Sequence, residues 1–224
     1  ATDAATLLLA QDWARDVSLV AMRPVAEQDW VRLTQSQFAP VEVAPAFWIV
    51  PSWHEVPPDA NKVIRLDPGL AFGTGTHPTT RMCLRWTARE AAQRAAGWSR
   101  VLDYGCGSGI LAIGAALHGA SEIDAVDIDP AAVESTRANA LANHVDLNAG
   151  LPDLARGVYP LVFANILATP LKLLAPLLSA HVAPGGCLVL AGILERQVDE
   201  LRSAYAPWLE LSVSDAEEGW VLMT

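Results

Sequence analysis

Cysteine is scarce in this sequence, and its three residues, Cys83, Cys106 and Cys187, lie far apart along the chain. None of them forms a C-x-x-C pair, and the five histidines are not spaced like the ligands of a metal ion. The sequence therefore argues against a disulfide framework and predicts no metal site.

No apolar run is long enough and uninterrupted enough to span a membrane. The longest, residues 161–182, has Lys172 as its only charged residue, but Asn165, Pro170 and Pro176 interrupt it. We interpret this run as a buried strand followed by a helix. The first residues also lack the basic region and cleavage motif of a secretory signal, so we expect a cytoplasmic protein without membrane association.

Positive charge is also in short supply. The chain has 15 Lys and Arg residues against 25 Asp and Glu residues, which gives a formal net charge of −10. A broad nucleic-acid surface requires clustered cations, so we expect no direct nucleic-acid binding. An acidic surface suits a basic protein partner, and acidity that only maintains solubility is the alternative.

Hydrophobic residues make up 52% of the 224 residues and charged residues 18%, which is enough for one globular α/β domain with an N-terminal attachment. From residue 100 onward, short apolar runs alternate with helical stretches. This pattern predicts a mostly parallel twisted sheet with helices on both faces. The expected strands are 100–104, 122–127, 145–148, 159–164 and 187–192.

Two further apolar runs end the chain, at 208–213 and 219–223, and the polar residues 214–218 separate them. This spacing leaves no room for a helix between the runs. We therefore expect a C-terminal antiparallel hairpin with its turn at 214–218.

The first part of the chain has a different pattern. We expect an alternating run at 17–22, a helix at 27–38 and a strand at 47–50, with prolines between them. The change in pattern predicts a lead-in segment at 1–60 and a catalytic domain at 61–224.

A glycine-rich loop follows the first strand of the α/β region. Gly105, Gly107 and Gly109 stand between Asp103, which ends the apolar part of the strand, and the helical run that begins at Ile110. Glycine is needed where the chain turns tightly and a ligand approaches the backbone. A dinucleotide loop, G-x-G-x-x-G, would require glycine at position 110. The spacing G-x-G-x-G after an acidic residue is instead typical of a methyltransferase.

Two aspartates complete the predicted donor site. S-adenosylmethionine carries a sulfonium and an α-ammonium group but no phosphate, and Asp103 supplies negative charge near them, unless it only fixes the loop. Eighteen residues after Gly109 (127 − 109), a strand ends in Asp127, where nucleotide-binding domains place the carboxylate that accepts the ribose hydroxyls. Asp129 precedes Pro130 and is interpreted as a helix N-cap.

The segment 67–80 is more specific than the glycine loop. Its sequence, DPGLAFGTGTHPTT, closely resembles the signature of the bacterial methyltransferases that modify the eleventh protein of the large ribosomal subunit. The likeness spans about Glu27 to the C-terminus. Its other matching segments are 48–53, 103–113, 126–130, 164–167 and 190–194.

The resemblance implies a class I methyltransferase that uses S-adenosylmethionine to methylate lysine side chains and the N-terminal amine of that basic ribosomal protein. It also implies that Thr80, Gly105, Asp127 and Asn165 contact the donor. Members of this family usually begin with a small α/β domain that recognises the substrate, and this sequence starts too late to contain it. We therefore expect a monomeric fragment in which residues 1–60 are the remnant of a recognition region.

Residues 72–80 also have a physical interpretation as a glycine-rich loop before an amphipathic helix, with Thr79 or Thr80 as the N-cap. Phe72 and His77 crowd into this loop and predict an adaptable lid in which Phe72 contacts the donor; an ordinary capped loop is the alternative. His77 could relay a proton, but solvent could do so equally well, so the base stays unassigned.

Asn165 follows the apolar residues 161–164 at the end of a strand, which places its amide at the carboxyl edge of the sheet, where ligands bind. The amide carbonyl can accept a hydrogen bond from an incoming amine and aim the nitrogen lone pair at the methyl carbon. The alternative is an asparagine that merely starts a turn. For Trp48, Trp53 and Trp220 we expect buried packing.

Three other functions compete with this one. A nicotinamide-dependent oxidoreductase is disfavoured by Ile110 and by Asp103. A catalytically idle module that only docks a ribosomal partner is disfavoured by the intact glycines, Asp127 and Asn165. A class I methyltransferase that acts on another protein or on a small-molecule amine remains open.

Overall fold

The chain divides by its internal contacts into two units, Ala1–Gln37 and Phe38–Thr224. In the first unit, helix α1 covers Thr2–Leu9. In the alternating run expected at 17–22, the described residues 17, 18, 20 and 21 belong to no helix or strand. The helix expected at 27–38 lies outside the described residues except for Phe38. The computed structural model describes residues 2–11, 17, 18, 20, 21, 38–67 and 75–224.

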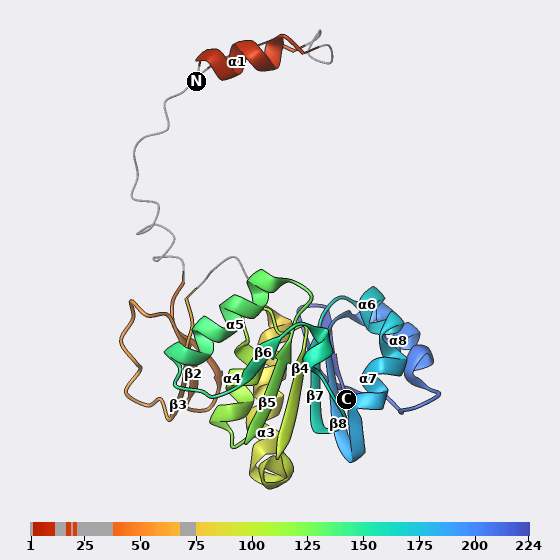
Figure 1. Ribbon diagram of the computed structural model, residues 1–224. Helices are drawn as coiled ribbons and strands as arrows, with labels where there is room; N and C mark the ends of the chain where they lie inside the picture. The colour runs from red at the N-terminus through yellow and green to blue at the C-terminus, as the bar shows by residue number, and fades with distance from the viewer. Residues whose placement is uncertain (1, 12–16, 19, 22–37, 68–74) are drawn as a thin grey trace. The chain divides into compact units, whose positions relative to one another are not determined.

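A seven-stranded sheet forms the centre of the second unit (Figure 1). Its strand order is β6-β5-β4-β7-β8-β10-β9, with β6 to β8 parallel and β10 antiparallel to both neighbours. The predicted mostly parallel sheet with a C-terminal antiparallel hairpin is thereby confirmed. The strands are β4 (Arg100–Tyr104), β5 (Glu122–Val126), β6 (Asn148–Gly150), β7 (Tyr159–Asn165), β8 (Val182–Leu194), β9 (Val213–Glu217) and β10 (Trp220–Met223).

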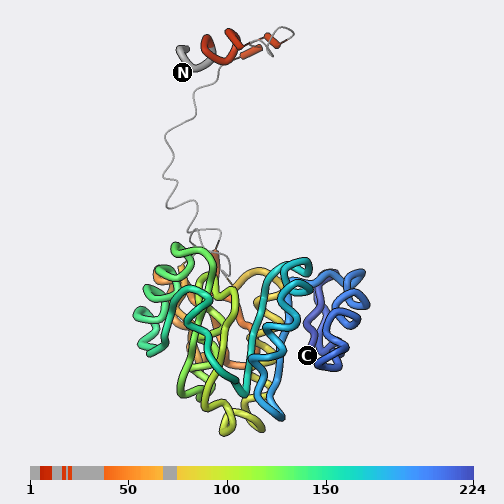
Figure 2. The backbone as a smooth tube through the Cα atoms, turned by 45° about the vertical axis from the view of Figure 1, so that its right-hand side comes forward, coloured from red at the N-terminus to blue at the C-terminus, as the bar shows by residue number. Residues whose placement is uncertain are grey.

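Helices cover both faces of this sheet (Figures 1 and 2). Because strand side chains alternate, Val101 and Phe163 pack in one core with α3 and α4, while Leu102 and Val162 pack in a second core with α6, α7 and α8. The helices are α3 (Pro78–Arg94), α4 (Ile110–Leu117), α5 (Pro130–Ala142), α6 (Ala168–Leu173), α7 (Ala175–His181) and α8 (Val198–Tyr205), with 3₁₀ turns η2 (Ala95–Gly97), η3 (Pro152–Leu154) and η4 (Glu195–Gln197).

A smaller sheet precedes the large one. The hairpin of β1 (Val41–Ala44) and β2 (Phe47–Val50) is followed by β3 (Lys62–Arg65), which pairs in parallel with β2. The predicted strand 47–50 is therefore confirmed. The functional division at residue 60 concerns substrate recognition and stays a prediction.

Asn143, the C-cap of α5, ties the small sheet to the rest of the unit. Its Oδ1 accepts the backbone N–H of Arg65 and its Nδ2 donates to the carbonyl of Arg65, both at 2.7 Å. These two bonds reproduce the pairing of a strand edge, so β3 is held against α5 by one side chain.

The C-terminal hairpin is present, but its predicted bounds were wrong. Strand β9 occupies residues 213–217, of which 214–217 were assigned to the turn, and Glu218-Gly219 connects it to β10. These two residues have φ values of 52° and 78°, the pattern of a tight type I′ turn, whose twist matches that of the strands. Polarity misled the prediction because the carboxylates of β9 pair with arginines of α3 and do not mark a loop.

Two other strand bounds also differ. Strand β6 lies at 148–150, not at 145–148, and β8 begins at Val182, not at 187. Strand β8 continues through Gly185 and Gly186 with an irregular register against β7. The run 161–182 is confirmed as a buried strand followed by helix, here two short helices. Within the described part of the chain, no helix is long and apolar enough to cross a membrane.

Candidate functional site

A cavity of about 510 Å³ opens at the edge where the parallel strands end. In open α/β sheets ligands bind at this edge. Six predicted site residues line the cavity together: His77, Thr80, Gly105, Gly107, Asp127 and Asn165. The remaining lining residues are Thr79, Cys106, Ile110, Leu111, Ile166, Leu167, Pro170, Gly192 and Trp220.

Three predicted site residues are not among these lining residues. Asp103 is buried on β4, beneath the glycine loop, and Gly109 is the N-cap of α4, so neither borders the cavity directly. Any influence of these two residues on a ligand has to act through the loop or through charge. Phe72, the predicted donor contact, lies outside the described residues.

The glycine loop forms a cradle of backbone beside the cavity. The N–H groups of Gly105 and Cys106 donate to the carbonyl of Val126 at 2.7 and 3.0 Å, which bends the loop over the end of β5. Gly105 has φ = 81°, and a Cβ there would lie 2.4 Å from Cγ2 of Ile166. The position therefore requires glycine for both its backbone conformation and its close packing.

Asp127 holds the loop and still has capacity for a ligand. Its Oδ2 accepts the N–H of Gly107 and its Oδ1 accepts the N–H of Asp129, both at 3.0 Å. A carboxylate has about four acceptor positions, so two remain for hydroxyl groups in the cavity. Asp129 accepts the N–H of Ala131 with Pro130 at the first helical position, which confirms the predicted N-cap of α5.

Asp103 is a fully buried carboxylate with an incomplete set of partners. Its Oδ2 accepts the N–H of Ala112 at 3.1 Å, and its Oδ1 has no hydrogen-bond partner among the described residues. Burial raises the pKa of Asp103 to about 7, the Ala112 N–H opposes that rise, and the charge of Asp127 adds to it. A cation in the cavity would favour the ionised form of this group.

Asn165 ends β7 with its amide at the cavity. Its Nδ2 lies 3.5 Å from Oγ1 of the buried Thr80, and its Oδ1 is buried without a partner among the described residues. A buried carbonyl oxygen without a donor costs free energy in the absence of a ligand. The site therefore presents an acceptor that a ligand N–H can satisfy.

His77, not Thr79 or Thr80, is the N-cap of α3. Its Nδ1 accepts the N–H of Thr79 at 3.3 Å and lies 2.8 Å from the Thr79 hydroxyl, while Pro78 occupies the first helical position. The prediction missed this because Ser, Thr, Asp and Asn are the usual caps. Burial and then the positive charge of Arg81 lower the pKa of His77, against an opposing effect of Glu218, so the imidazole is neutral at pH 7.

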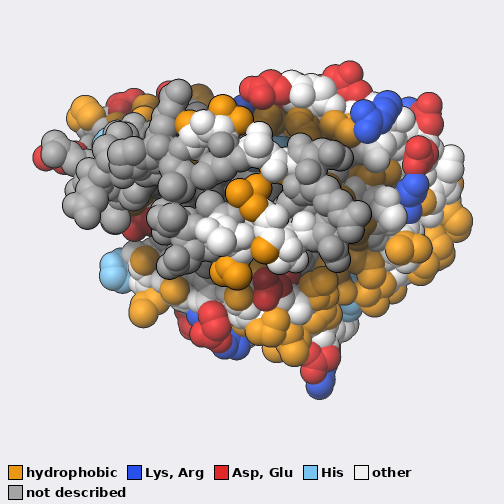
Figure 3. All heavy atoms as spheres, turned by 90° about the horizontal axis from the view of Figure 1, so that it is seen from above, with side chains coloured by type: hydrophobic (Ala, Val, Ile, Leu, Met, Phe, Trp, Pro, Cys, Tyr) orange, Lys and Arg blue, Asp and Glu red, His pale blue; other side chains and the backbone are white. Residues whose placement is uncertain are grey.

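The apolar part of the lining was missed by the sequence prediction. Ile166, Leu167 and Pro170 follow Asn165 directly, so nearness to a strand end was the available signal. Trp220 approaches His77 edge-on, at 5.0 Å between ring centroids, and nothing in the sequence links these two residues. Figure 3, seen from above, shows hydrophobic side chains gathered on the side of α6 to α8. By its accessible surface, Leu167 is an exposed part of the cavity lining.

The strand order, the glycine loop and the cavity at the carboxyl edge define a class I methyltransferase. The model of the ribosomal protein L11 methyltransferase (PrmA) family matches residues 1–224, so the chain belongs to this family. Its methyl donor is accordingly S-adenosylmethionine.

Curated relatives agree with this assignment. The chain is 70% identical over 223 residues to the ribosomal protein L11 methyltransferase of a Polaromonas species, covering 100% of the chain and 74% of the relative. It is 54% identical over 204 residues to the protein of the same name from Cupriavidus metallidurans, covering 91% of the chain and 66% of the relative. The chain thus spans 66% to 74% of the length of these two relatives.

Solved structures give the same fold. A ribosomal protein L11 methylase from Lactobacillus delbrueckii subsp. bulgaricus superposes with a TM-score of 0.71 at 29% identity, covering 84% of this chain and 98% of that one. A 16S rRNA methyltransferase from T. thermophilus superposes with a TM-score of 0.54 at 20% identity, covering 68% of this chain and 44% of that one, and shows the shared fold alone.

Proposed function

We propose that this chain transfers methyl groups from S-adenosylmethionine to lysine side-chain amines and the N-terminal amine of ribosomal protein L11. The observation that carries the proposal is the buried Oδ1 of Asn165, which lines the cavity with the glycine loop and has no hydrogen-bond partner in the described part of the chain. An amine N–H is the complement of that oxygen. The name shared by the relatives supports the choice of protein substrate.

The residues present fit the donor. The two remaining acceptor positions of Asp127 suit the ribose hydroxyls, and Gly105 and Gly107 line the cavity with backbone alone, so a ligand can approach the main chain closely. Asp103 provides negative charge beneath the loop for the cationic part of the donor. Phe72, Thr80 and Gly109 complete the proposed donor-binding set. A mostly apolar lining excludes water from the reaction.

The donor supplies a methyl group that its sulfonium already activates. Asn165 accepts a hydrogen bond from the acceptor amine and directs the nitrogen lone pair toward the methyl carbon. A carbon–nitrogen bond forms as the carbon–sulfur bond breaks, and the nitrogen loses one proton. Alignment is the main demand on the protein, because no covalent intermediate with a side chain is needed.

The proton goes to His77 or to solvent. The lowered pKa of His77 keeps its imidazole neutral and able to accept a proton. Its Nδ1 already serves as the cap of α3, so only Nε2 can take part without disturbing the helix start. The base stays unassigned between these two acceptors.

The proposal extends to the setting in which the reaction occurs. A net charge of −10 favours a basic protein substrate and disfavours nucleic acid, and a ribosomal substrate places the reaction in the cytoplasm, with the chain acting as a monomer. The described site residues all lie between His77 and Trp220, which supports residues 61–224 as the catalytic domain and 1–60 as the link to substrate recognition.

The test is methyl incorporation from labelled S-adenosylmethionine into purified L11, with the modified amines identified by mass spectrometry. Wild type should methylate L11, and Asn165→Ala should lower kcat by about a hundredfold while donor affinity stays within about threefold. Asn61→Ala, which removes an exposed amide away from the cavity, is the matched control and should behave as wild type.

Two results would count against the proposal. Donor binding by the wild type without incorporation into L11 would favour the idle binding module or another acceptor. Wild-type turnover by Asn165→Ala would remove Asn165 from the transfer step.

A further inference from the structure

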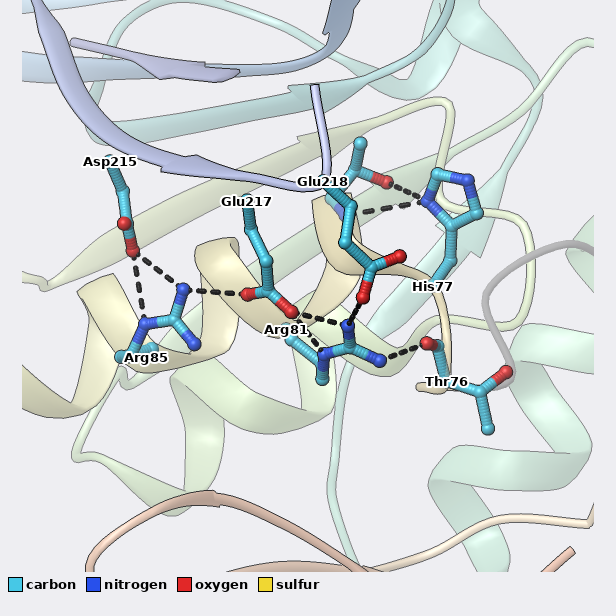
Figure 4. Close-up of polar contacts among 8 residues, drawn as sticks. Thr76, His77, Arg81, Arg85, Asp215, Glu217 and Glu218 are labelled. Carbon is cyan, nitrogen blue, oxygen red and sulfur yellow. Dashed lines mark hydrogen bonds and ion pairs between the residues drawn. The ribbon is translucent and has the colours of Figure 1, made fainter. Parts of the chain in front are cut away.

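A cluster of ion pairs joins the start of α3 to the C-terminal hairpin (Figure 4). Arg81 pairs with Glu217 and Glu218, and Arg85, one helical turn later, pairs with Asp215 and Glu217. Burial alone would raise the pKa of Glu217, but hydrogen bonds from Arg85 and then Arg81 hold it below its usual value. Helix and hairpin are thus joined by shared carboxylates across more than 130 residues of sequence.

The two arginines differ in what else they hold. Arg81 also donates through Nη1 to the carbonyl of Thr76, the residue before the N-cap His77. Its Nη2 lies 3.2 Å from Oε1 of Glu218 in the hairpin turn. Among the described residues, Arg85 bonds to Asp215 and Glu217 of strand β9 and to neither of these two positions. Arg81 therefore joins three parts of the site, whereas Arg85 joins only helix to strand.

The position of Arg81 makes this connection necessary. It is the fourth residue of α3, where a positive charge faces the positive end of the helix dipole. Carboxylates from the hairpin and the Thr76 carbonyl offset that repulsion. The hairpin turn is consequently fixed at the helix start, and the next residue, Trp220, meets the ring of His77 edge-on.

His77 and Trp220 together form one wall of the cavity. This wall adjoins Asn165, because the Asn165 amide contacts Thr80 on the first turn of the same helix. The glycine loop and Asp127 also line the cavity, and their bonds run to Val126 and Asp129 and not to the hairpin. A shift of the hairpin would therefore displace the His77–Trp220 wall before it moved the glycine loop.

We propose that Arg81 is a positioning residue for methyl transfer: by joining Thr76 to Glu217 and Glu218, it fixes the His77–Trp220 wall that orients the acceptor amine. The inference deepens the proposed function and rests on its amine acceptor. Arg81 itself is not among the residues that line the cavity, so it acts through the two rings.

The experiment compares Arg81→Gln with Arg85→Gln, since each removes two ion pairs between α3 and β9 or its turn. Arg81→Gln should lower kcat/KM for L11 by about tenfold or more, with donor Kd within about threefold of wild type. Arg85→Gln should keep both values within about threefold. Arg81→Lys should recover little of the loss, because one ammonium cannot bridge a carbonyl and two carboxylates at once.

A second measurement does not depend on the acceptor. Hydrogen exchange should quicken at residues 75–80 and 218–222 in Arg81→Gln but not at 75–80 in Arg85→Gln. If both variants lose activity equally and in proportion to the fall in their melting temperatures, the cluster only stabilises the fold and the inference is overturned. A wild type that fails to methylate L11 would refute the proposed function instead, and the exchange comparison would still decide the role of Arg81.

Discussion

Each face of the central sheet buries one carboxylate, and the two carboxylates differ in their number of hydrogen-bond partners. Asp103 on β4 points to the side of α3 and α4, whereas Asp124 on β5, one position earlier in register, points to the other side. Asp124 accepts hydrogen bonds from Asn148, Arg100 and Tyr159 at 2.8 to 3.0 Å. Within the described ranges, Asp103 accepts one hydrogen bond, from the Ala112 N–H.

The difference distinguishes a buried carboxylate whose hydrogen bonds are made within the protein from polar groups that keep capacity for a ligand. Arg100 lies over the ring of Tyr159, 4.3 Å from its centroid, so the partners of Asp124 also support each other. The chain completes this group by itself, as buried polar groups require. Asp103 and Asn165 each keep one buried oxygen without a partner among the described residues, and both belong to the side of the sheet edge that a ligand completes.

The same isosteric substitution should therefore have opposite results on the two faces. Asp124→Asn places an amide N–H₂ among three donors and removes the charge that Arg100 pairs with. We expect a loss of about 3 to 5 kcal/mol in the free energy of unfolding, with unchanged donor affinity. Urea denaturation measures the first quantity and calorimetric titration the second. A free energy of unfolding of Asp124→Asn close to that of wild type would show that the hydrogen bonds of Asp124 are not required for stability, against this interpretation.

Asp103→Asn should become more stable than wild type as pH rises. The pKa of Asp103 is raised from 3.8 to about 7 on folding, so between these values the folded state holds a proton that the unfolded state has lost. Wild-type stability contributed by this group therefore falls as pH rises through that window, and asparagine has no such loss. Relative to wild type, the variant should gain about 2 to 3 kcal/mol between pH 5 and pH 8.

Denaturation curves at several pH values test this difference, with Asp124→Asn as the matched control. A pH-independent difference between Asp103→Asn and wild type would show that the carboxyl is already ionised in the folded protein.

The smallest effect that we expect is the release of protons when the donor binds. A donor cation should favour ionised Asp103, so binding near pH 7 should release up to about half a proton. Titration calorimetry in buffers of different ionisation enthalpy counts these protons. Asp103→Asn should abolish the release. If the variant releases as many protons as wild type, another group is responsible.

Much of the α/β region could be predicted from the sequence, because its strands are short apolar runs that end at glycine, aspartate or asparagine. Strand β4 and strand β7 followed the expected ranges closely. The bounds of β9 could not be predicted, since its polar residues are held by Arg81 and Arg85, which are remote in sequence. Local polarity cannot distinguish a turn from a strand whose charges are paired elsewhere.

The candidate site divides in the same way. Asp127 and Asn165 could be placed at one edge because both end parallel strands, a consequence of topology alone. The cap role of His77 was missed because histidine is not among the usual caps, and its contact with Trp220 depends on how the hairpin packs against α3. The relation of Asp103 to the cavity also required the structure, because spacing shows which residues precede a loop but not which lie beneath it.

Ile166 occupies the space that side chains at two glycines would need. A Cβ at Gly105 would lie 2.4 Å from its Cγ2, and a Cβ at Gly192 would lie 2.2 Å from its carbonyl oxygen. Asn165 is the preceding residue, so the position of its amide depends on the absence of a Cβ atom at both glycines. For an engineer who reshapes this enzyme toward a bulkier amine, trimming the isoleucine creates room. A methyl group at Gly192 would instead press on the main chain of Ile166 and displace the neighbouring asparagine, whereas one at Gly105 would meet the isoleucine side chain.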